Sequence, residues 1–165
     1  MIRLAKPEEI ERILVIYTAA RAFMRAAGNP TQWGNSHPEK STLLDDIEKG
    51  QLYVVERADA SDICACFALI GGDDPTYAEI DGQWRSDASY GTLHRVGSDG
   101  SQKGVFTQCA DFAKSKYDHL RIDTHEDNLP MQTVIKRNGF QYAGVIICAN
   151  GTPRIAFDWI SVEKE

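Results

Sequence analysis

The chain has 165 residues, of which 42% are hydrophobic and 25% are charged. This composition is typical of a globular protein that buries one core, and we expect a single domain over residues 1–165. The formal net charge is −6 and no basic patch stands out, which argues against nucleic-acid binding. No signal peptide is evident and every apolar run is too short to cross a bilayer, so we expect a cytoplasmic protein without membrane contact.

The four cysteines, Cys64, Cys66, Cys109 and Cys148, do not form a metal-binding pattern. They include no CxxC pair, and no Cys/His set has zinc-finger spacing. We therefore expect reduced, mostly buried thiols and no metal site. Because residues two apart in a strand point to one face, Cys64 and Cys66 are expected on the same side of a sheet.

The first half of the chain predicts a strand, two helices and a hairpin. Residues 2–5 alternate apolar and polar side chains, as a short strand does. Residues 7–27 begin with proline and two acids and continue with apolar residues at helical spacing. Residues 38–50 form a second helix that ends at a glycine. Residues 51–57 and 63–70 are strands separated by a polar turn, which indicates an antiparallel hairpin.

The middle of the chain contains a loop insertion and a strand, loop and helix. Residues 77–90 include three acids and a tryptophan without a clear period, and we interpret them as a substrate-side insertion. Residues 93–96 form a strand that leads into the glycine-rich loop 97–104 and the helix 105–116. Backbone N–H groups at such a helix start lack intrahelical partners and attract phosphate. A phosphate-bearing cofactor is the first hypothesis.

The last third predicts a strand at residues 119–124 and a helix that Asn128 caps and Gly139-Phe140 closes. Residues 140–148 and 153–160 form a closing hairpin across Asn150-Gly151, a strong turn signal. The order of elements predicts an α/β (α+β) fold: a single mixed, mostly antiparallel sheet of about seven strands, with helices on both faces.

This order resembles the GNAT superfamily of acyl-CoA-dependent N-acetyltransferases over essentially the whole chain. The segment from His94 to Phe112 is similar to the acetyl-CoA motif of that family. Residues 122–128 (IDTHEDN) followed by residues 136–140 (KRNGF) are similar to its second signature. The resemblance implies direct transfer of an acetyl group from acetyl-CoA to a primary amine of a small molecule, without a covalent enzyme intermediate or a metal. Homodimers are common among proteins that this chain resembles.

The resemblance also implies a set of residues that bind the cofactor. They come from the fourth strand, the glycine-rich loop and the start of the last major helix: Arg95, Val96, Gly97, Gly100, Ser101, Gln102, Lys103, Gly104, Val105, Phe106, Asn128 and Met131. Backbone N–H groups of residues 95–97 are expected to bind the thioester carbonyl oxygen. Ser101 replaces the family's basic or amide residue, and Phe106 replaces its final small residue. Ile135 occupies the position at which many members carry a tyrosine that protonates the departing thiolate.

Three residues are candidates for deprotonating the amine. His94 lies immediately before the cofactor loop, and the usual imidazole pKa near 6.5 suits a base at neutral pH. Its alternative role is that of a packed or hydrogen-bonded sheet residue. Glu79 and Asp81 flank Ile80 and share one face of an extended segment, so they could attract a cationic amine or accept its proton through water. The alternative is that both are solvated loop acids.

Three further residues are candidates for substrate binding. Trp33 and Trp84 lie in loops and could line an acceptor pocket, although packing beside the core explains them equally well. His125 follows the strand 119–124, near the place where active sites of the resembled family open. Asn128 is expected both to cap its helix and to contact the cofactor. The altered loop and Ile135 keep a second hypothesis open, in which a weakly active or inactive module of this fold binds CoA or a protein partner.

Overall fold

The structure is a computed structural model that describes residues 1–162. Its eight strands form one sheet, and four α-helices and two short 3-10 helices accompany it. The strands are β1 (Ile2–Leu4), β2 (Leu52–Glu56), β3 (Ile63–Gly71), β4 (Asp81–Gly82), β5 (Gly91–Ser98), β6 (His119–Thr124), β7 (Gln141–Ile147) and β8 (Pro153–Ile160). The helices are η1 (Pro7–Glu9), α1 (Ile10–Ala26), α2 (Lys40–Glu48), η2 (Pro75–Tyr77), α3 (Val105–Lys116) and α4 (Leu129–Arg137).

The sheet has the order β1-β2-β3-β5-β6-β8-β7-β4 and is antiparallel except between β5 and β6. The predicted mixed, mostly antiparallel sheet is confirmed, with one strand more than expected. The added strand β4 lies within residues 77–90 and pairs with β7 for two residues only. Gly82 permits this pairing, because a Cβ atom there would lie 2.2 Å from the carbonyl oxygen of Ala143. Two residues are too few to show a strand period.

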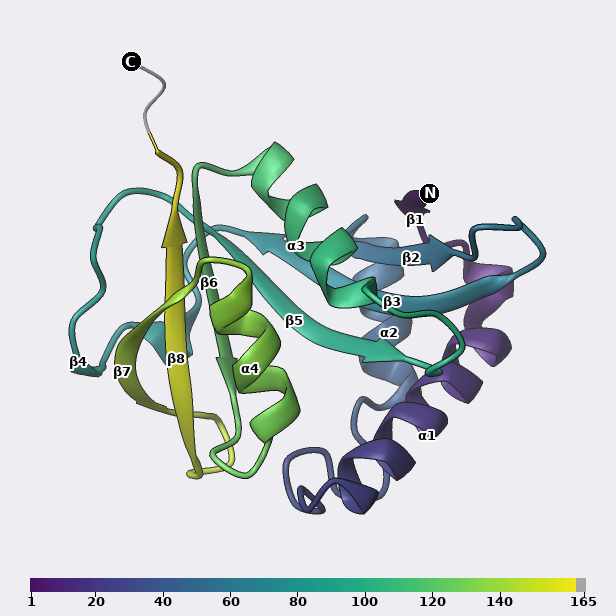
Figure 1. Cartoon of the computed structure of the whole chain (residues 1–165), viewed down its shortest axis with the longest axis horizontal. Coiled ribbons are helices and arrows are strands. Elements are labelled where there is room, and N and C mark those ends of the chain that lie inside the picture. Colours follow the sequence, from purple (N-terminus) through teal and green to yellow (C-terminus); the bar gives the residue numbers. More distant parts are fainter. Residues whose placement is uncertain (163–165) are drawn as a thin grey trace.

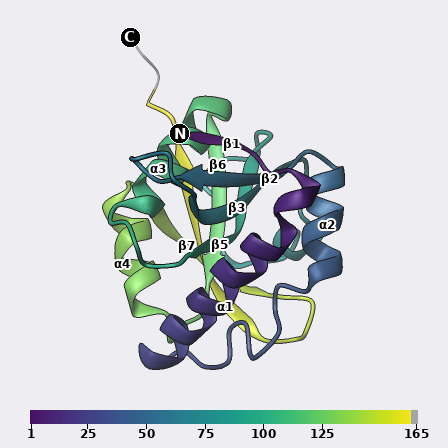
Figure 2. The same ribbon diagram turned by 90° about the vertical axis from the view of Figure 1, so that its right-hand side faces the viewer.

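Helices cover both faces of the sheet, as predicted (Figures 1 and 2). On one face, α1 and α2 pack over β2, β3 and β5 through a core that includes Ile13, Ile16 and Leu43. On the other face, α3 and α4 cover a core that includes Phe67, Leu93 and Phe157. None of the helices in residues 1–162 is both long enough and apolar enough to cross a membrane.

The expected shared face of Cys64 and Cys66 is wrong. Cys64 belongs to the core beneath α3, whereas Cys66 belongs to the core beneath α1. The cause is an irregularity between β2 and β3, where Val55 pairs with Ala65 but the next residue, Glu56, pairs with Ile63. Cys64 is the extra residue of this β-bulge, and one extra residue reverses the alternation of faces.

The two central strands separate soon after they meet. β5 and β6 pair only at Gly91–Leu120 and Thr92–Arg121, although both strands continue further. Beyond this point the ribbons diverge, with β6 and β8 on one side and β5 and β3 on the other (Figure 1). Arg95 lies in the diverging part with φ +53°, where the β3–β5 register also shifts. A bulge therefore turns the β5 backbone at the opening.

Candidate active site

A pocket of about 610 Å³ opens where β5 and β6 separate. Its walls come from the central strands at residues 93–96 and 122–124, from the loop at residues 31–34, and from the β7–β8 turn at residues 148–150. Met131 of α4 and Asp74 of the β3–η2 loop also contribute. Segments far apart in the sequence thus meet where β5 and β6 are no longer paired.

His94 and Asp74 form a hydrogen-bonded pair in the pocket wall. The Nε2 atom of His94 lies 2.7 Å from Oδ2 of Asp74, while Oδ1 of Asp74 accepts from both the N–H and the hydroxyl of Thr76. The hydrogen bond to His94, together with those from Thr76, lowers the pKa of Asp74 to about 2. Asp74 therefore stays ionised at neutral pH and fixes the orientation of the imidazole.

A second carboxylate, that of Asp123, also lines the pocket. Its Oδ2 atom accepts a hydrogen bond of 2.6 Å from the hydroxyl of Tyr77. Burial, followed by the nearby charge of Asp123, raises the pKa of Tyr77 well above its ordinary value, so this hydroxyl remains a donor. The Tyr77 ring also stacks on His94 with 6.2 Å between centroids. Tyr77 thus holds both the acid and the imidazole in place.

The bulge at Arg95 is held from the face of the sheet that α1 and α2 cover. The Arg95 guanidinium makes two hydrogen bonds, of 2.8 and 2.9 Å, to the buried carboxylate of Asp46 on α2. The hydroxyl of Tyr17 on α1 donates to the carbonyl oxygen of Arg95 at 2.6 Å. Both contacts stabilise the left-handed backbone conformation, which a non-glycine residue rarely adopts.

The floor of the pocket contains a polar cluster around Gln32. The Oε1 atom of Gln32 accepts from Nδ2 of Asn29 at 2.8 Å and from Nδ2 of Asn128 at 3.0 Å, with the Thr124 hydroxyl at 3.5 Å. The other end of the Asn128 amide accepts from the N–H of Met131, which confirms the predicted helix cap. The cluster fixes the loop after α1 against β6 and α4.

The glycine-rich loop leads into α3 as the sequence indicates. Gly104 precedes the helix in the left-handed conformation, and the first N–H groups of α3 have no intrahelical acceptors. Nearer to β5, loop side chains bind the loop's own backbone: Oγ of Ser98 accepts from Gly100, and Oδ1 of Asp99 accepts from Ser101. Anion-binding capacity is therefore concentrated at the helix end of the loop.

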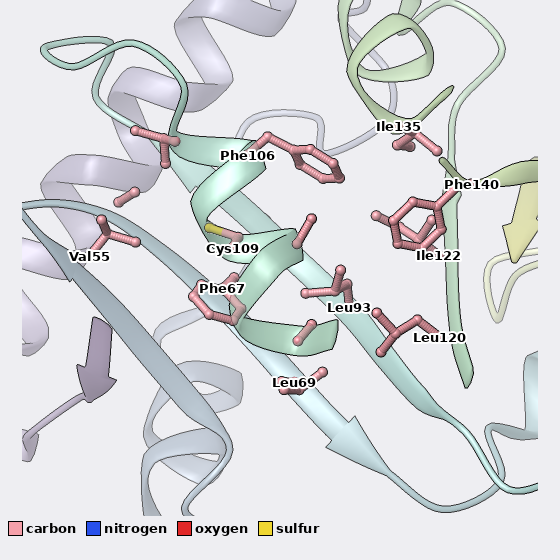
Figure 3. Packing of buried hydrophobic residues seen from close by; sticks show 14 of the residues in the cluster. Val55, Phe67, Leu69, Leu93, Phe106, Cys109, Leu120, Ile122, Ile135 and Phe140 are labelled. Atoms are coloured by element: carbon pink, nitrogen blue, oxygen red, sulfur yellow. The ribbon is translucent and has the colours of Figure 1, made fainter. Parts of the chain in front are cut away.

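Phe106 and Ile135 are core residues. Phe106 is 9% exposed, and its ring points from α3 toward Ile135, Ile122 and Phe140, away from the glycine-rich loop (Figure 3). Bulk at this position therefore fills the core and leaves the helix N-terminus open. Ile135 is fully buried in the same cluster. Its hydrocarbon side chain cannot donate a proton.

The remaining predicted site residues are divided between the pocket and other places. Trp33 lines the pocket, as do Arg95 and Val96, and it packs edge-on against Tyr17. Glu79 and Asp81 are exposed and lie outside the pocket lining. Trp84 donates to the carbonyl oxygen of Tyr77 and covers the Arg121 guanidinium. His125 is also outside the lining, with Nε2 3.3 Å from the hydroxyl of Thr31, which lines the pocket.

Sequence reasoning missed several residues of the pocket wall. Asp74 lies between the predicted strand 63–70 and the insertion 77–90, in a segment that contains Gly72 and Pro75. Gln32 lies in the loop after α1, and Arg154 lies at the start of a hairpin strand. None of these belongs to a local motif, because the tertiary fold alone brings them together. The available signal was the presence of two charged residues, Arg154 and Asp158, in an otherwise apolar strand.

Comparisons with known proteins support one family. No protein-family model matches the chain, and no curated protein matches it. A solved structure of a GNAT-family acetyltransferase from Streptococcus agalactiae is 29% identical, with a TM-score of 0.86 over 99% of this chain and 96% of that one.

Two more distant structures share the fold. A GNAT-family acetyltransferase from Listeria monocytogenes is 19% identical, with a TM-score of 0.72 over 98% of this chain and 94% of that one. A protein from Salmonella typhimurium, whose structure is described with its cofactor acetyl-CoA, is 14% identical, with a TM-score of 0.62 over 99% and 95%. The whole chain therefore matches these proteins in architecture.

Proposed function

The chain belongs to the GNAT family of acetyltransferases, and from this membership we propose that it transfers an acetyl group from acetyl-CoA directly to the primary amine of a small molecule. The proposal that the acceptor is an amine rests on the pair formed by His94 and Asp74 in the pocket wall. An imidazole held by an ionised carboxylate can accept a proton from an amine. Asp123 adds a second negative charge that attracts the cationic form of the acceptor.

The residues present fit acetyl-CoA as the donor. Val96 and Met131 line the pocket between β5 and α4, and Gly104 leads into the N-terminus of α3, which favours phosphate. Because the Phe106 ring is in the core, it does not block the N-terminus of α3. When bound, acetyl-CoA supplies an acetyl group activated as a thioester.

The protein's own groups account for the other requirements of the reaction. His94 takes the amine proton, and Asp74 holds the imidazole and stabilises its charged form. The bulge leaves Arg95 and Val96 outside the β3–β5 register, and the backbone N–H groups of residues 95–97 are proposed to bind the developing negative charge on the carbonyl oxygen. Since Ile135 has no proton to donate, the thiolate leaves unprotonated or takes its proton from water.

The proposal is tested by CoA thiol release across a panel of primary amines. His94→Gln should lower kcat/KM by about 10²- to 10⁴-fold, the usual contribution of a positioned base. CoA binding, measured by thermal shift, should not change. An equal loss in a variant combining Glu79→Gln with Asp81→Asn would contradict this assignment and favour the loop acids.

The same experiment separates the enzyme from a non-catalytic module. Stabilisation by CoA without turnover of any amine would favour the module, whose altered loop and Ile135 provide its support. The absence of any shift with CoA or acetyl-CoA would overturn both readings.

A further inference from the structure

Arg154 is a buried cation in the pocket wall that has no carboxylate partner among residues 1–162. Its side chain lines the pocket, and the residue is 6% exposed. Its guanidinium donates to the hydroxyl of Thr152 at 2.8 Å, to the carbonyl oxygen of Pro153 at 3.1 Å and to that of Gln32 at 3.4 Å. Within residues 1–162 it forms no ion pair. A buried guanidinium is usually paired, since desolvation of an unpaired charge is costly.

The other basic groups of the pocket do not share this property. Arg95 is neutralised by its two hydrogen bonds to Asp46. Burial lowers the pKa of His37, and the nearby charges of Arg95 and Arg154 lower it further, so this imidazole is mainly neutral at pH 7. Arg154 is therefore the cation that remains available to an anionic group in the pocket.

A second donor belongs to Gln32, whose backbone carbonyl oxygen accepts from Arg154. The Oε1 atom of Gln32 is occupied by Asn29, Asn128 and Thr124, so its Nε2 group is left to donate. Among residues 1–162 this Nε2 group has no acceptor within hydrogen-bond distance, and Gln32 lines the pocket. A guanidinium and an amide donor together suit the two oxygens of a carboxylate.

The acidic and basic groups occupy neighbouring strands of one sheet face. Asp123 of β6 pairs with Ala156 of β8, and Arg154 lies two residues from Ala156, on the same face. His94 of the adjacent strand β5 lines the same pocket. The pocket thus carries Asp74, His94 and Asp123 at the β3–η2 loop, β5 and β6, and Arg154 at the start of β8.

We propose that the acceptor is a zwitterion: a small molecule with a primary amine at the His94 side and a carboxylate bound by Arg154 and Gln32, that is, an amino acid or a similar amino carboxylate. This inference rests on the proposed function for its chemistry. The carboxylate supplies the partner that Arg154 lacks. It also positions the amine beside the imidazole, since the two charges of the ligand match two separated charges of the pocket.

The test compares matched acceptors that differ only in the carboxylate. For amino acids and the corresponding amino-acid amides and alkylamines, kcat/KM is measured from CoA thiol release. Binding to the CoA-saturated protein is measured by calorimetry, so the result does not depend on turnover. We expect the carboxylate to improve both quantities by about tenfold to a hundredfold, as a charge-assisted hydrogen bond does.

Arg154→Gln should reduce this preference to within about threefold, and Arg154→Lys should retain part of it, since it keeps the charge but not the bidentate geometry. Arg25→Gln, an exposed position on α1 outside the pocket, is the matched control. If Arg154 only joined the loop containing Gln32 to the β7–β8 hairpin, its replacement would weaken the binding of acids and amides equally. It would also lower Tm.

The experiment separates failure of the zwitterion proposal from failure of the proposed function. Equal binding of acids and amides by the wild-type protein overturns the zwitterion proposal, even if amines are acetylated. Selective carboxylate binding that depends on Arg154, without any acetyl transfer, supports the ligand class and overturns the proposed function.

Discussion

Replacing Asp74 by asparagine tests whether its carboxylate is held as the structure indicates. The pKa of Asp74 falls from its ordinary 3.8 to about 2, chiefly through the hydrogen bond to His94. A difference of this size corresponds to about 2 kcal/mol of folding free energy at neutral pH. The Asp74 side chain is 19% exposed, so solvent screening removes only part of this stabilisation. We therefore expect Asp74→Asn to lower the free energy of unfolding by about 1–2 kcal/mol at pH 7.

The sign of the pH dependence follows from the direction of the pKa shift. A carboxylate with a depressed pKa stabilises the fold above its ordinary pKa, and this stabilisation is lost as pH falls through the native value. The difference between wild type and Asp74→Asn should stay constant from pH 7 to pH 5 and fall to about half near pH 3. Urea denaturation at pH 7, 5, 4 and 3 measures it.

The control is Asp73→Asn, which removes an exposed carboxylate from the neighbouring position. It should change stability by less than about 0.5 kcal/mol at each pH. A second check is the double-mutant cycle with His94→Gln, in which the two single effects should not add. If the Asp74→Asn difference remains the same from pH 7 to pH 3, the carboxylate is not stabilised in the native state and the reasoning is refuted.

Three other predictions concern packing and thiol chemistry. A Cβ atom at Gly97 would lie 2.8 Å from the Tyr17 ring, so Gly97→Ala should cost about 1–3 kcal/mol in denaturation experiments, and an unchanged Tm would contradict this packing. Burial raises the pKa of three of the four thiols, so a thiol reagent should modify Cys148 alone in the native protein and all four after unfolding. Asp158 is fully buried and accepts from the backbone N–H and Nε of Arg85, so Asp158→Ala should cost about 3 kcal/mol and expose residues 77–90 to limited proteolysis, whereas resistance equal to wild type would argue against this anchor.

The sequence was sufficient for the elements with strong local signals. The polar turn between the strands at residues 51–57 and 63–70 predicted the β2–β3 hairpin, and the Asn150-Gly151 turn predicted the β7–β8 hairpin. Departures from regularity could not be predicted. The bulge at Cys64 and the positive φ of Arg95 are imposed by tertiary packing, because nothing in the local sequence requires them.

The candidate site was predictable to the extent that it follows a local motif. The strand before the loop drew attention to His94, and that residue lines the pocket. Its partner Asp74 lies twenty positions earlier, in a segment whose glycines and proline hid its role. Glu79 and Asp81 were predicted from their charge and from their spacing around Ile80, and neither feature distinguishes a pocket acid from one in a solvated loop.

The pattern of polar residues in the central strands explains why the pocket was difficult to predict from the sequence. His94, Asp123 and Arg154 occupy the polar positions of alternating strands, a pattern typical of a sheet with one face in water. Here the face is covered instead: Tyr77 and Asp74 of the β3–η2 segment pack over it, and Arg154 is buried beneath the loop that contains Gln32. Desolvation then makes each charge require a partner. Among residues 1–162, His94 has Asp74 and Asp123 has Tyr77, whereas the guanidinium of Arg154 has only neutral oxygens, and in the proposed complex the acceptor carboxylate supplies the missing charge.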